Sequence, residues 1–215
     1  MSNRLNSHFI WGSHSPLSSL IGVGLIILAS NRFAFALVCA GALLWVYGLT
    51  ALVFSFFRKY MPAKGRMIIL LFLSTFFCGI FILLAALSNP LLVMEVAFFL
   101  VLIPPSCLGS GFFEAVDSAV SIEPLKIVSR ALFEASVLAG IILAFSLIRE
   151  PIGMGTLSFP GSAHGIVELF DNRGADGFVT IRIFSASAGA LLLLGYAIAL
   201  YRYFKKRSGK LSEEK

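Results

Sequence analysis

The chain has 215 residues, of which 58% are hydrophobic and only 13% are charged. A soluble domain of this size would not carry so much apolar surface, so the composition excludes a soluble globular protein. The net charge of +6 lies mainly in short loops and in the C-terminal tail, which indicates membrane topology rather than nucleic-acid binding. The apolar runs do not alternate with polar residues, so we predict an all-α integral membrane protein embedded in the lipid bilayer.

Six apolar segments follow a polar lead-in over residues 1–15. The first segment is short and carries Gly22 and Gly24, and the fourth is interrupted by prolines. The other four are long enough to span a hydrocarbon layer of about 30 Å. In chain order, we place the six segments at residues 16–30, 33–57, 67–87, 91–120, 131–148 and 183–204.

The fourth segment contains a break. Pro104 and Pro105 end the apolar run that begins at Leu91, which leaves about a dozen residues, too few for a helix to cross the membrane. Cys107 and Glu114 follow the break. Breaks of this kind within a membrane mark sites lined by protein or water, so we expect the functional site here.

The basic residues predict the topology. Six spans place thirteen of the 17 Lys and Arg residues on one side of the membrane, and positively charged loops stay cytoplasmic. We therefore expect both termini in the cytoplasm. The thirteen are Arg4, Arg58, Lys59, Lys64, Arg66, Lys126, Arg130, Arg202, Lys205, Lys206, Arg207, Lys210 and Lys215; the remaining four are Arg32, Arg149, Arg173 and Arg182.

The two halves of the chain follow the same plan. Each has a short segment with glycines followed by two longer spans, and three crossings per half invert the second half relative to the first. We predict two inverted three-helix repeats in a single membrane domain, with broken half-helices at the first and fourth spans. The repeats cover residues 16–87 and 91–204, the second with an outer loop at 149–180, and a basic cytoplasmic tail follows at 205–215.

Two acidic residues beyond the break are candidates for an ion pathway. Glu114 lies seven residues after Cys107, on the same face if the segment is helical, and Asp117 follows one turn later. The alternative is that both carboxylates are solvated at the cytoplasmic interface. We place Glu95 and Glu134, near the ends of their segments, at the membrane interfaces.

Arg149 and Glu150 close the fifth span. We expect the arginine to lie near the C-terminal carbonyls of its own helix, with Gly153 and Gly155 turning the chain, in a structural role at the interface of the repeats. The long loop that follows is a surface suited to a partner subunit.

Cys39 and Cys78 lie inside apolar segments, without a CxxC pair or a nearby histidine. We interpret both as small buried hydrophobic residues. Cys107, beside the break, is the thiol with a candidate function.

Three motifs resemble those of a known family, the paired membrane subunits of the Rnf and Na⁺-pumping NADH:quinone (Nqr) complexes, in the RnfE/NqrD branch. Residues 149–157 are similar to its R-E-I-I-G-x-G-T-L, residues 60–66 to its W-T-P-A-E-I-R, and residues 106–115 to its N-C-I-V-x-G-R-A-E-A. The resemblance extends from about Trp11 to the last span.

The resemblance implies a multi-pass subunit in the inner membrane of a bacterium, within an ion-translocating electron-transport complex. A sister subunit of the RnfA/NqrE type would face it, and the two would share one [2Fe-2S] cluster held by a cysteine from each half-helix. Cys107 would be one ligand. Electrons would pass through this centre, coupled to Na⁺ or H⁺ movement, while NADH, flavin and ferredoxin would bind to other subunits.

The sequence departs from the family at the cluster. The first-half ligand is expected at Gly24, and glycine has no side chain to offer iron; Ser106 and Phe112 also differ from the pattern. Three outcomes stay open: Cys107 with the partner's cysteines and one unusual ligand, a displaced cluster, or no cluster. The alternative function is therefore a cluster-free transporter or scaffold that kept the fold, and whether the chain takes part in catalysis is undecided.

Overall fold

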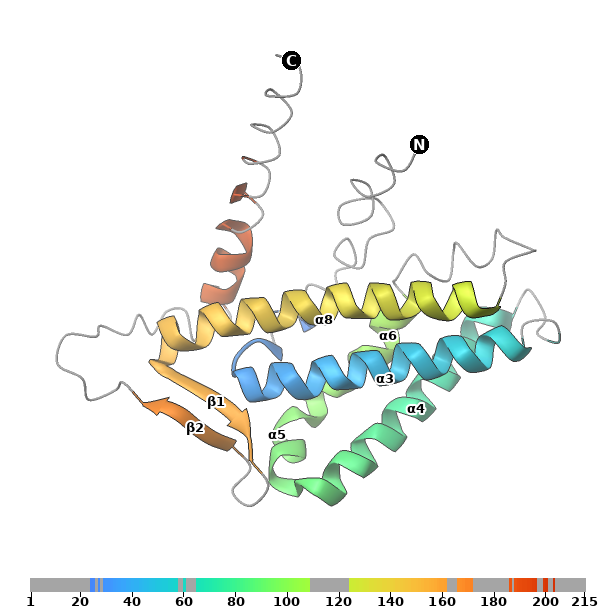
Figure 1. Cartoon of the computed structure of the whole chain (residues 1–215), viewed down its shortest axis with the longest axis horizontal. Helices are drawn as coiled ribbons and strands as arrows, with labels where there is room; N and C mark the ends of the chain where they lie inside the picture. Colours follow the sequence, from blue (N-terminus) through green and yellow to red (C-terminus); the bar gives the residue numbers. More distant parts are fainter. Residues whose placement is uncertain are drawn as a thin grey trace, which may run out of the picture.

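The computed structural model describes residues 24–25, 27, 29–57, 60, 65–108, 124–161, 166–171, 186, 188–196, 199–200 and 203. Among the elements that the structure delimits, three long helices and two short ones surround one core, and a hairpin of two strands covers one end (Figure 1). The elements are α3 (Phe33–Phe57), α4 (Arg66–Ser88), α5 (Pro90–Leu100), α6 (Ile103–Leu108), α8 (Pro124–Met154), β1 (Thr156–Pro160) and β2 (Ile166–Asp171).

The core lies between α3 and α8, which run antiparallel side by side (Figure 1). Both helices bury small and apolar side chains, among them Leu43, Leu138 and Ile142. Gly48 allows a close approach, because a Cβ atom at this position would lie 3.2 Å from Leu132 of α8. The α3–α8 pair is therefore the frame on which the other elements pack.

Two predicted spans are confirmed almost residue for residue. The prediction at 33–57 coincides with α3, and that at 67–87 differs from α4 by one residue at each end. Within the described part of the chain, three helices are long and apolar enough to cross a membrane: α3, α4 and Leu125–Met154 of α8.

The fifth span is longer than predicted at both ends. Residues 124–130, which precede the predicted span, are helical as well, because buried Ile127 continues the apolar face of Ala131 and Ala135. At the other end, α8 runs past Arg149 to Met154. Gly155 then ends the helix with φ 68° and donates its N–H to the Pro151 carbonyl at 3.0 Å.

The break in the fourth span is confirmed, but it lies before the prolines rather than at them. Helix α5 has 11 residues and is about 16 Å long, about half of a hydrocarbon core. It ends at Leu100, and Pro104 and Pro105 lie in the first turn of α6, where a helix needs no N–H donor. A proline has no N–H, so the carbonyl four residues before it loses its helical hydrogen bond. The turn that precedes the proline is weakened for this reason.

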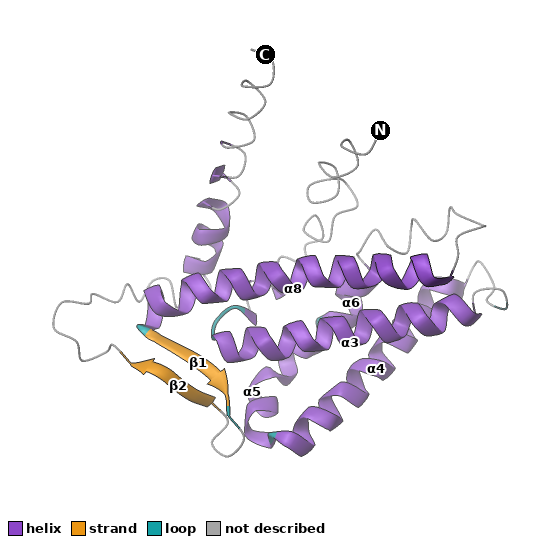
Figure 2. Ribbon diagram, viewed as in Figure 1, coloured by secondary structure: helices purple, strands orange, loops and turns teal. Residues whose placement is uncertain are grey.

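The outer loop predicted at 149–180 contains secondary structure, and the prediction of an all-α fold needs this correction. Strands β1 and β2 pair antiparallel with a bulge between Leu157 and Ser158 (Figure 2). The alternation in β1 runs opposite to the usual pattern, since Thr156 and Ser158 are buried while Phe159 is half-buried. The polar side chains face inward because Thr156 donates to the Glu150 carboxylate and Ser158 accepts from the Ala34 N–H at the start of α3. The described fold is thus mostly helical with one hairpin.

Much of the predicted repeat lies outside the described residues. Residues 24–25, 27 and 29 are helical within the first predicted segment, and residues 188–196, 199–200 and 203 within the sixth. Residues 109–123, which complete the fourth segment, are not described. Six spans and two inverted repeats therefore stay a prediction.

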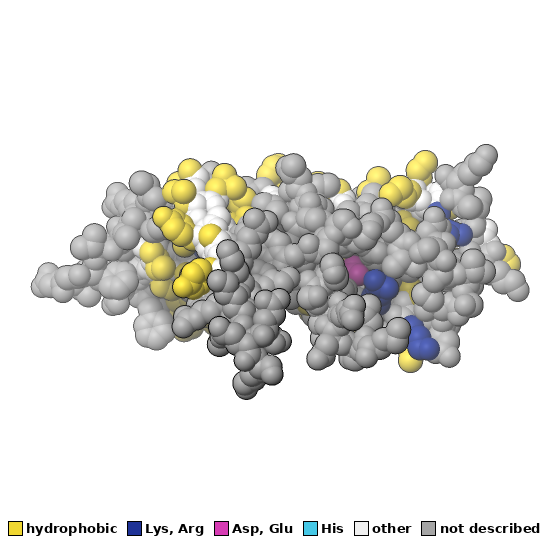
Figure 3. Space-filling model, turned by 90° about the horizontal axis from the view of Figure 1, so that it is seen from above, with side chains coloured by type: hydrophobic (Ala, Val, Ile, Leu, Met, Phe, Trp, Pro, Cys, Tyr) yellow, Lys and Arg dark blue, Asp and Glu magenta, His cyan; other side chains and the backbone are white. Residues whose placement is uncertain are grey.

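The described basic residues form two groups at opposite ends of the molecule. Arg66 begins α4, and Lys126 and Arg130 lie in the first two turns of α8; these two helix ends lie at the same end of the molecule (Figure 1). Lys and Arg side chains gather toward one end of the face in Figure 3, while hydrophobic side chains are spread along it. Arg32 and Arg149 belong to the opposite end, near the start of α3 and the end of α8. This grouping agrees with the sides that the sequence assigns to these residues.

The α4–α5 turn depends on Asn89. Its side chain accepts a hydrogen bond from the Leu92 N–H at 3.3 Å and donates another to the Gly161 carbonyl beyond β1. We expect Asn89→Ala to lower the free energy of unfolding by about 1 kcal/mol, because an N-cap and a link to the hairpin are lost together. Unfolding in mixed detergent micelles measures this.

The matched control is Ser88→Ala. The Ser88 hydroxyl is exposed and bonds only to Leu84 of its own helix, at 3.2 Å, so we expect a change within about 0.5 kcal/mol. Equal effects of the two substitutions would contradict the assignment of Asn89 as the residue that holds the turn.

Candidate functional site

The end of the first segment is held by Arg149. One guanidinium nitrogen donates to the Ile27 carbonyl at 2.8 Å and to the Ser30 hydroxyl at 3.0 Å, and the other donates to the Ala186 carbonyl at 3.2 Å. Arg149 itself is 3% exposed. A buried guanidinium with several acceptors is well satisfied, because its donors form a rigid fork.

The start of α3 is held by Glu150, the next residue. One carboxylate oxygen accepts the Phe33 N–H at 2.6 Å, and the other accepts the Thr156 hydroxyl at 3.5 Å. The Ser158 hydroxyl of β1 accepts the neighbouring Ala34 N–H at 3.4 Å. A carboxylate at a helix N-terminus satisfies backbone donors and interacts favourably with the helix dipole.

The Arg149–Glu150 pair thus binds both sides of the turn at residues 30–32. The prediction of a structural role is supported, but the expected partner of the arginine was wrong. Arg149 does not bind the carbonyls of its own helix; it binds Ile27 and Ala186, which are distant in sequence. Sequence reasoning missed Ser158, although the reversed alternation in β1 could have indicated a buried polar face.

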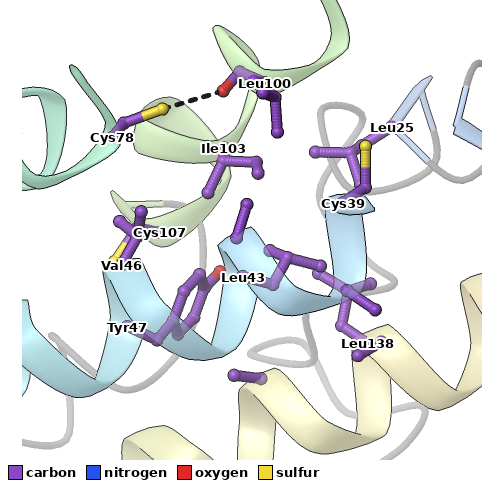
Figure 4. Packing of buried hydrophobic residues seen from close by; sticks show 14 of the residues in the cluster. Leu25, Cys39, Leu43, Val46, Tyr47, Cys78, Leu100, Ile103, Cys107 and Leu138 are labelled. Carbon is purple, nitrogen blue, oxygen red and sulfur yellow. Dashed lines mark hydrogen bonds between the residues drawn. The ribbon is translucent and has the colours of Figure 1, made fainter. Parts of the chain in front are cut away.

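Cys107 lies in α6, which packs against both α3 and α4. Its side chain is 1% exposed and belongs to the core cluster, on the side of α6 that faces α3 near Val46 (Figure 4). Cys39 and Cys78 are buried in the same cluster, and all three cysteines are thiols rather than disulfides. The interpretation of Cys39 and Cys78 as buried residues is confirmed.

Glu134 is a buried carboxylate, not the interfacial residue that we predicted. It is 2% exposed and lies on the α8 face that carries Ala131 and Leu138, three and four residues away. Arg130 is its ion-pair partner, with 3.6 Å between Nε and Oε1, and the Arg130 side chain is half exposed. The helical spacing of the buried positions was the signal that could have revealed this burial.

Glu134 lies at the level of α6. Across the antiparallel α3–α8 pair, Phe33 meets Glu150 and Gly48 meets Leu132, so Glu134 lies opposite the region of Tyr47. Tyr47 is also buried, and the Glu134 carboxylate is close enough to interact electrostatically with the Cys107 thiol. The described part of the site is therefore one thiol, one carboxylate and one phenol within an apolar core.

This set of side chains does not fit a [2Fe-2S] cluster shared between two subunits. Gly24 has open space where a Cβ would be and no ligand atom, and the Cys107 thiol is covered by its own chain instead of facing outward. Among the described residues, no three His, Cys, Asp or Glu side chains are grouped to hold a metal ion. Glu114 and Asp117, the predicted ion-pathway candidates, lie outside the described residues.

Apolar helices of spanning length and buried polar side chains at helix ends define a helical membrane protein. Over 149 residues the chain is 30% identical to a protein of Glaesserella parasuis serovar 5 (strain SH0165) that is named as the E subunit of an ion-translocating oxidoreductase complex. This similarity agrees with the resemblance of the motifs to the RnfE/NqrD branch. The match covers 69% of this chain and 64% of that relative, less than two thirds of the relative's length. No family model matches the chain.

The buried arginine gives a stability prediction. We expect Arg149→Ala to lower the free energy of unfolding by about 3 kcal/mol, because a buried hydroxyl and two part-buried carbonyls lose their donor together. Reversible unfolding in mixed micelles, followed by tryptophan fluorescence, measures the loss.

Arg130→Ala serves as the control on the same helix. Its side chain is half exposed and makes an ion pair at 3.6 Å, so the expected cost is below about 1 kcal/mol. If Arg149→Ala cost no more than Arg130→Ala, the contacts of Arg149 would not be holding the helix ends together.

Proposed function

We propose that this chain is a membrane subunit of an ion-translocating oxidoreductase complex of the Rnf or Nqr type, in the bacterial inner membrane with both termini in the cytoplasm. It would assemble with a sister membrane subunit and with the subunits that bind the soluble electron donor. The observation that carries the proposal is the 30% identity to a subunit of such a complex, together with three helices of spanning length.

The position of the break supports a working site within the membrane. Cys78 is the thirteenth of the 23 residues of α4 and contacts the end of α5, so the break lies near the middle of a full span. Broken helices at this depth line binding sites or pathways in membrane proteins. The role of the chain would be to keep this break and the residues around it in place beside the sister subunit.

Two candidate roles of this chain in the complex follow. In the first, Cys107 and the cysteines of the sister subunit hold a shared [2Fe-2S] cluster, and electrons cross the membrane through it. In the second, the chain is a cluster-free subunit that kept the fold. Gly24 and the inward position of Cys107 favour the second candidate, because a shared cluster needs thiols at the surface where the two subunits meet.

The deciding experiment purifies the full chain with its associated subunits from native membranes in mild detergent. We expect oxidoreductase subunits to co-purify, and we expect Cys107→Ala to leave the iron content and the electron paramagnetic resonance spectrum of the assembly unchanged. Loss of a [2Fe-2S] signal in Cys107→Ala would establish the first candidate instead. A chain that purifies without any oxidoreductase subunit would overturn the proposed function.

Glu134 is the described residue best placed to take part in ion movement. A carboxylate buried among membrane helices is costly to keep, and such residues commonly mark ion or proton pathways. Its partner Arg130 lies closer to the start of α8 and is half exposed, so the ion pair links Glu134 to the surface of the chain on that side.

We expect Glu134→Gln to slow ion translocation by the assembled complex, measured in proteoliposomes, by at least about tenfold. Glu95→Gln is the control, because Glu95 is exposed on α5, and it should leave the rate within about twofold of the natural chain. Equal rates in both variants would exclude Glu134 from the pathway.

A further inference from the structure

The two prolines of α6 leave two backbone carbonyls without their helical donors. In an α-helix the carbonyl of Leu100 would accept the N–H of residue 104, and that of Val101 the N–H of residue 105. Both positions are proline, which has no N–H. The chain instead makes a tight turn, in which Leu102 N–H bonds to the Phe99 carbonyl at 3.1 Å.

The Leu100 carbonyl is enclosed by protein, because the whole residue is 0% exposed. A buried carbonyl without a donor is costly in an apolar interior, where no water replaces the lost hydrogen bond. Leu100 therefore needs a donor from another element.

Cys78 of α4 supplies this donor. Its thiol donates to the Leu100 carbonyl at 3.3 Å, as the dashed line in Figure 4 marks. Cys78 is 3% exposed, and α4 packs against both α5 and α6, so the thiol lies at the junction of the three helices. This contact gives Cys78 a polar function that burial alone does not require.

We propose that Cys78 is a positioning residue: its thiol holds the end of α5 and thereby fixes where the helix breaks and where α6 places Cys107. The proposal rests on the proposed function only in treating the α5–α6 break as the working part of the subunit. Cys78 acts through the backbone and is not itself a ligand or a reacting group.

The test compares serine and alanine at position 78 in the full-length chain. Serine keeps an O–H donor and alanine removes it, while both shorten the side chain. We expect Cys78→Ala to raise the unfolding equilibrium constant about fivefold above that of Cys78→Ser. We also expect N-ethylmaleimide to label Cys107 about tenfold faster in Cys78→Ala, with Cys78→Ser restoring the slow rate of the natural chain.

Cys39 provides a matched control with the opposite sign. It is a buried thiol of the same cluster, and the described structure gives it no hydrogen bond, so a serine there would bury a hydroxyl without a partner. We expect Cys39→Ser to be less stable than Cys39→Ala. The labelling of Cys107 should stay slow in both.

A larger loss for serine than for alanine at both positions would overturn the proposal, because it would show that Cys78 acts only by apolar packing. Unchanged labelling of Cys107 in Cys78→Ala would overturn it as well, since α6 would then keep its place without the thiol. Both measurements use the chain in detergent and need no cluster or sister subunit. Failure of the proposed function is therefore distinguishable from failure of this inference.

Discussion

The rest of the structure depends on the need to satisfy backbone groups at helix ends that are buried in an apolar interior. Arg149 and Glu150 meet this need for two helix ends at once, the carbonyl end of the first segment and the N–H end of α3. Ile27 and Phe33, their partners at these two helix ends, lie more than a hundred residues away in sequence. Arg149 and Glu150 are adjacent and hold both sides of one turn. This single dipeptide therefore places the first segment, α3, α8 and the hairpin relative to one another.

The same constraint explains how the chain can resemble its relatives while departing from them at the cluster. The contacts that hold the helix ends involve Arg149, Glu150, Ser158 and Cys78, and none of them requires a metal ion. These contacts and the packing of α3 on α8 therefore do not depend on whether position 24 carries a ligand. The activity has to be argued from the site rather than from the architecture.

The positions of the charged side chains follow from how well their surroundings can stabilise a charge. Arg66, Lys126 and Arg130 lie at one end of the helices, where long side chains can reach water, whereas Glu134 lies inside the core with Arg130 one turn away. The Arg130–Glu134 ion pair therefore joins a half-exposed side chain near the start of α8 to the interior. This asymmetry makes Glu134 a different kind of residue from Glu95, which is exposed on α5, although both are acids in apolar helices.

The sequence by itself determined the membrane class, the extents of α3 and α4 and the break after α5, because long apolar runs and prolines act locally along the chain. Only the tertiary structure decided the partners of Arg149 and Glu150, the hairpin in the outer loop and the burial of Glu134 and Cys107. Those features depend on which segments meet across the α3–α8 interface. Pro104 leaves the Leu100 carbonyl without a helical donor, and the Cys78 thiol supplies one. No local sequence pattern specifies this contact, because only the packing of α4 against α5 brings Cys78 and Leu100 together.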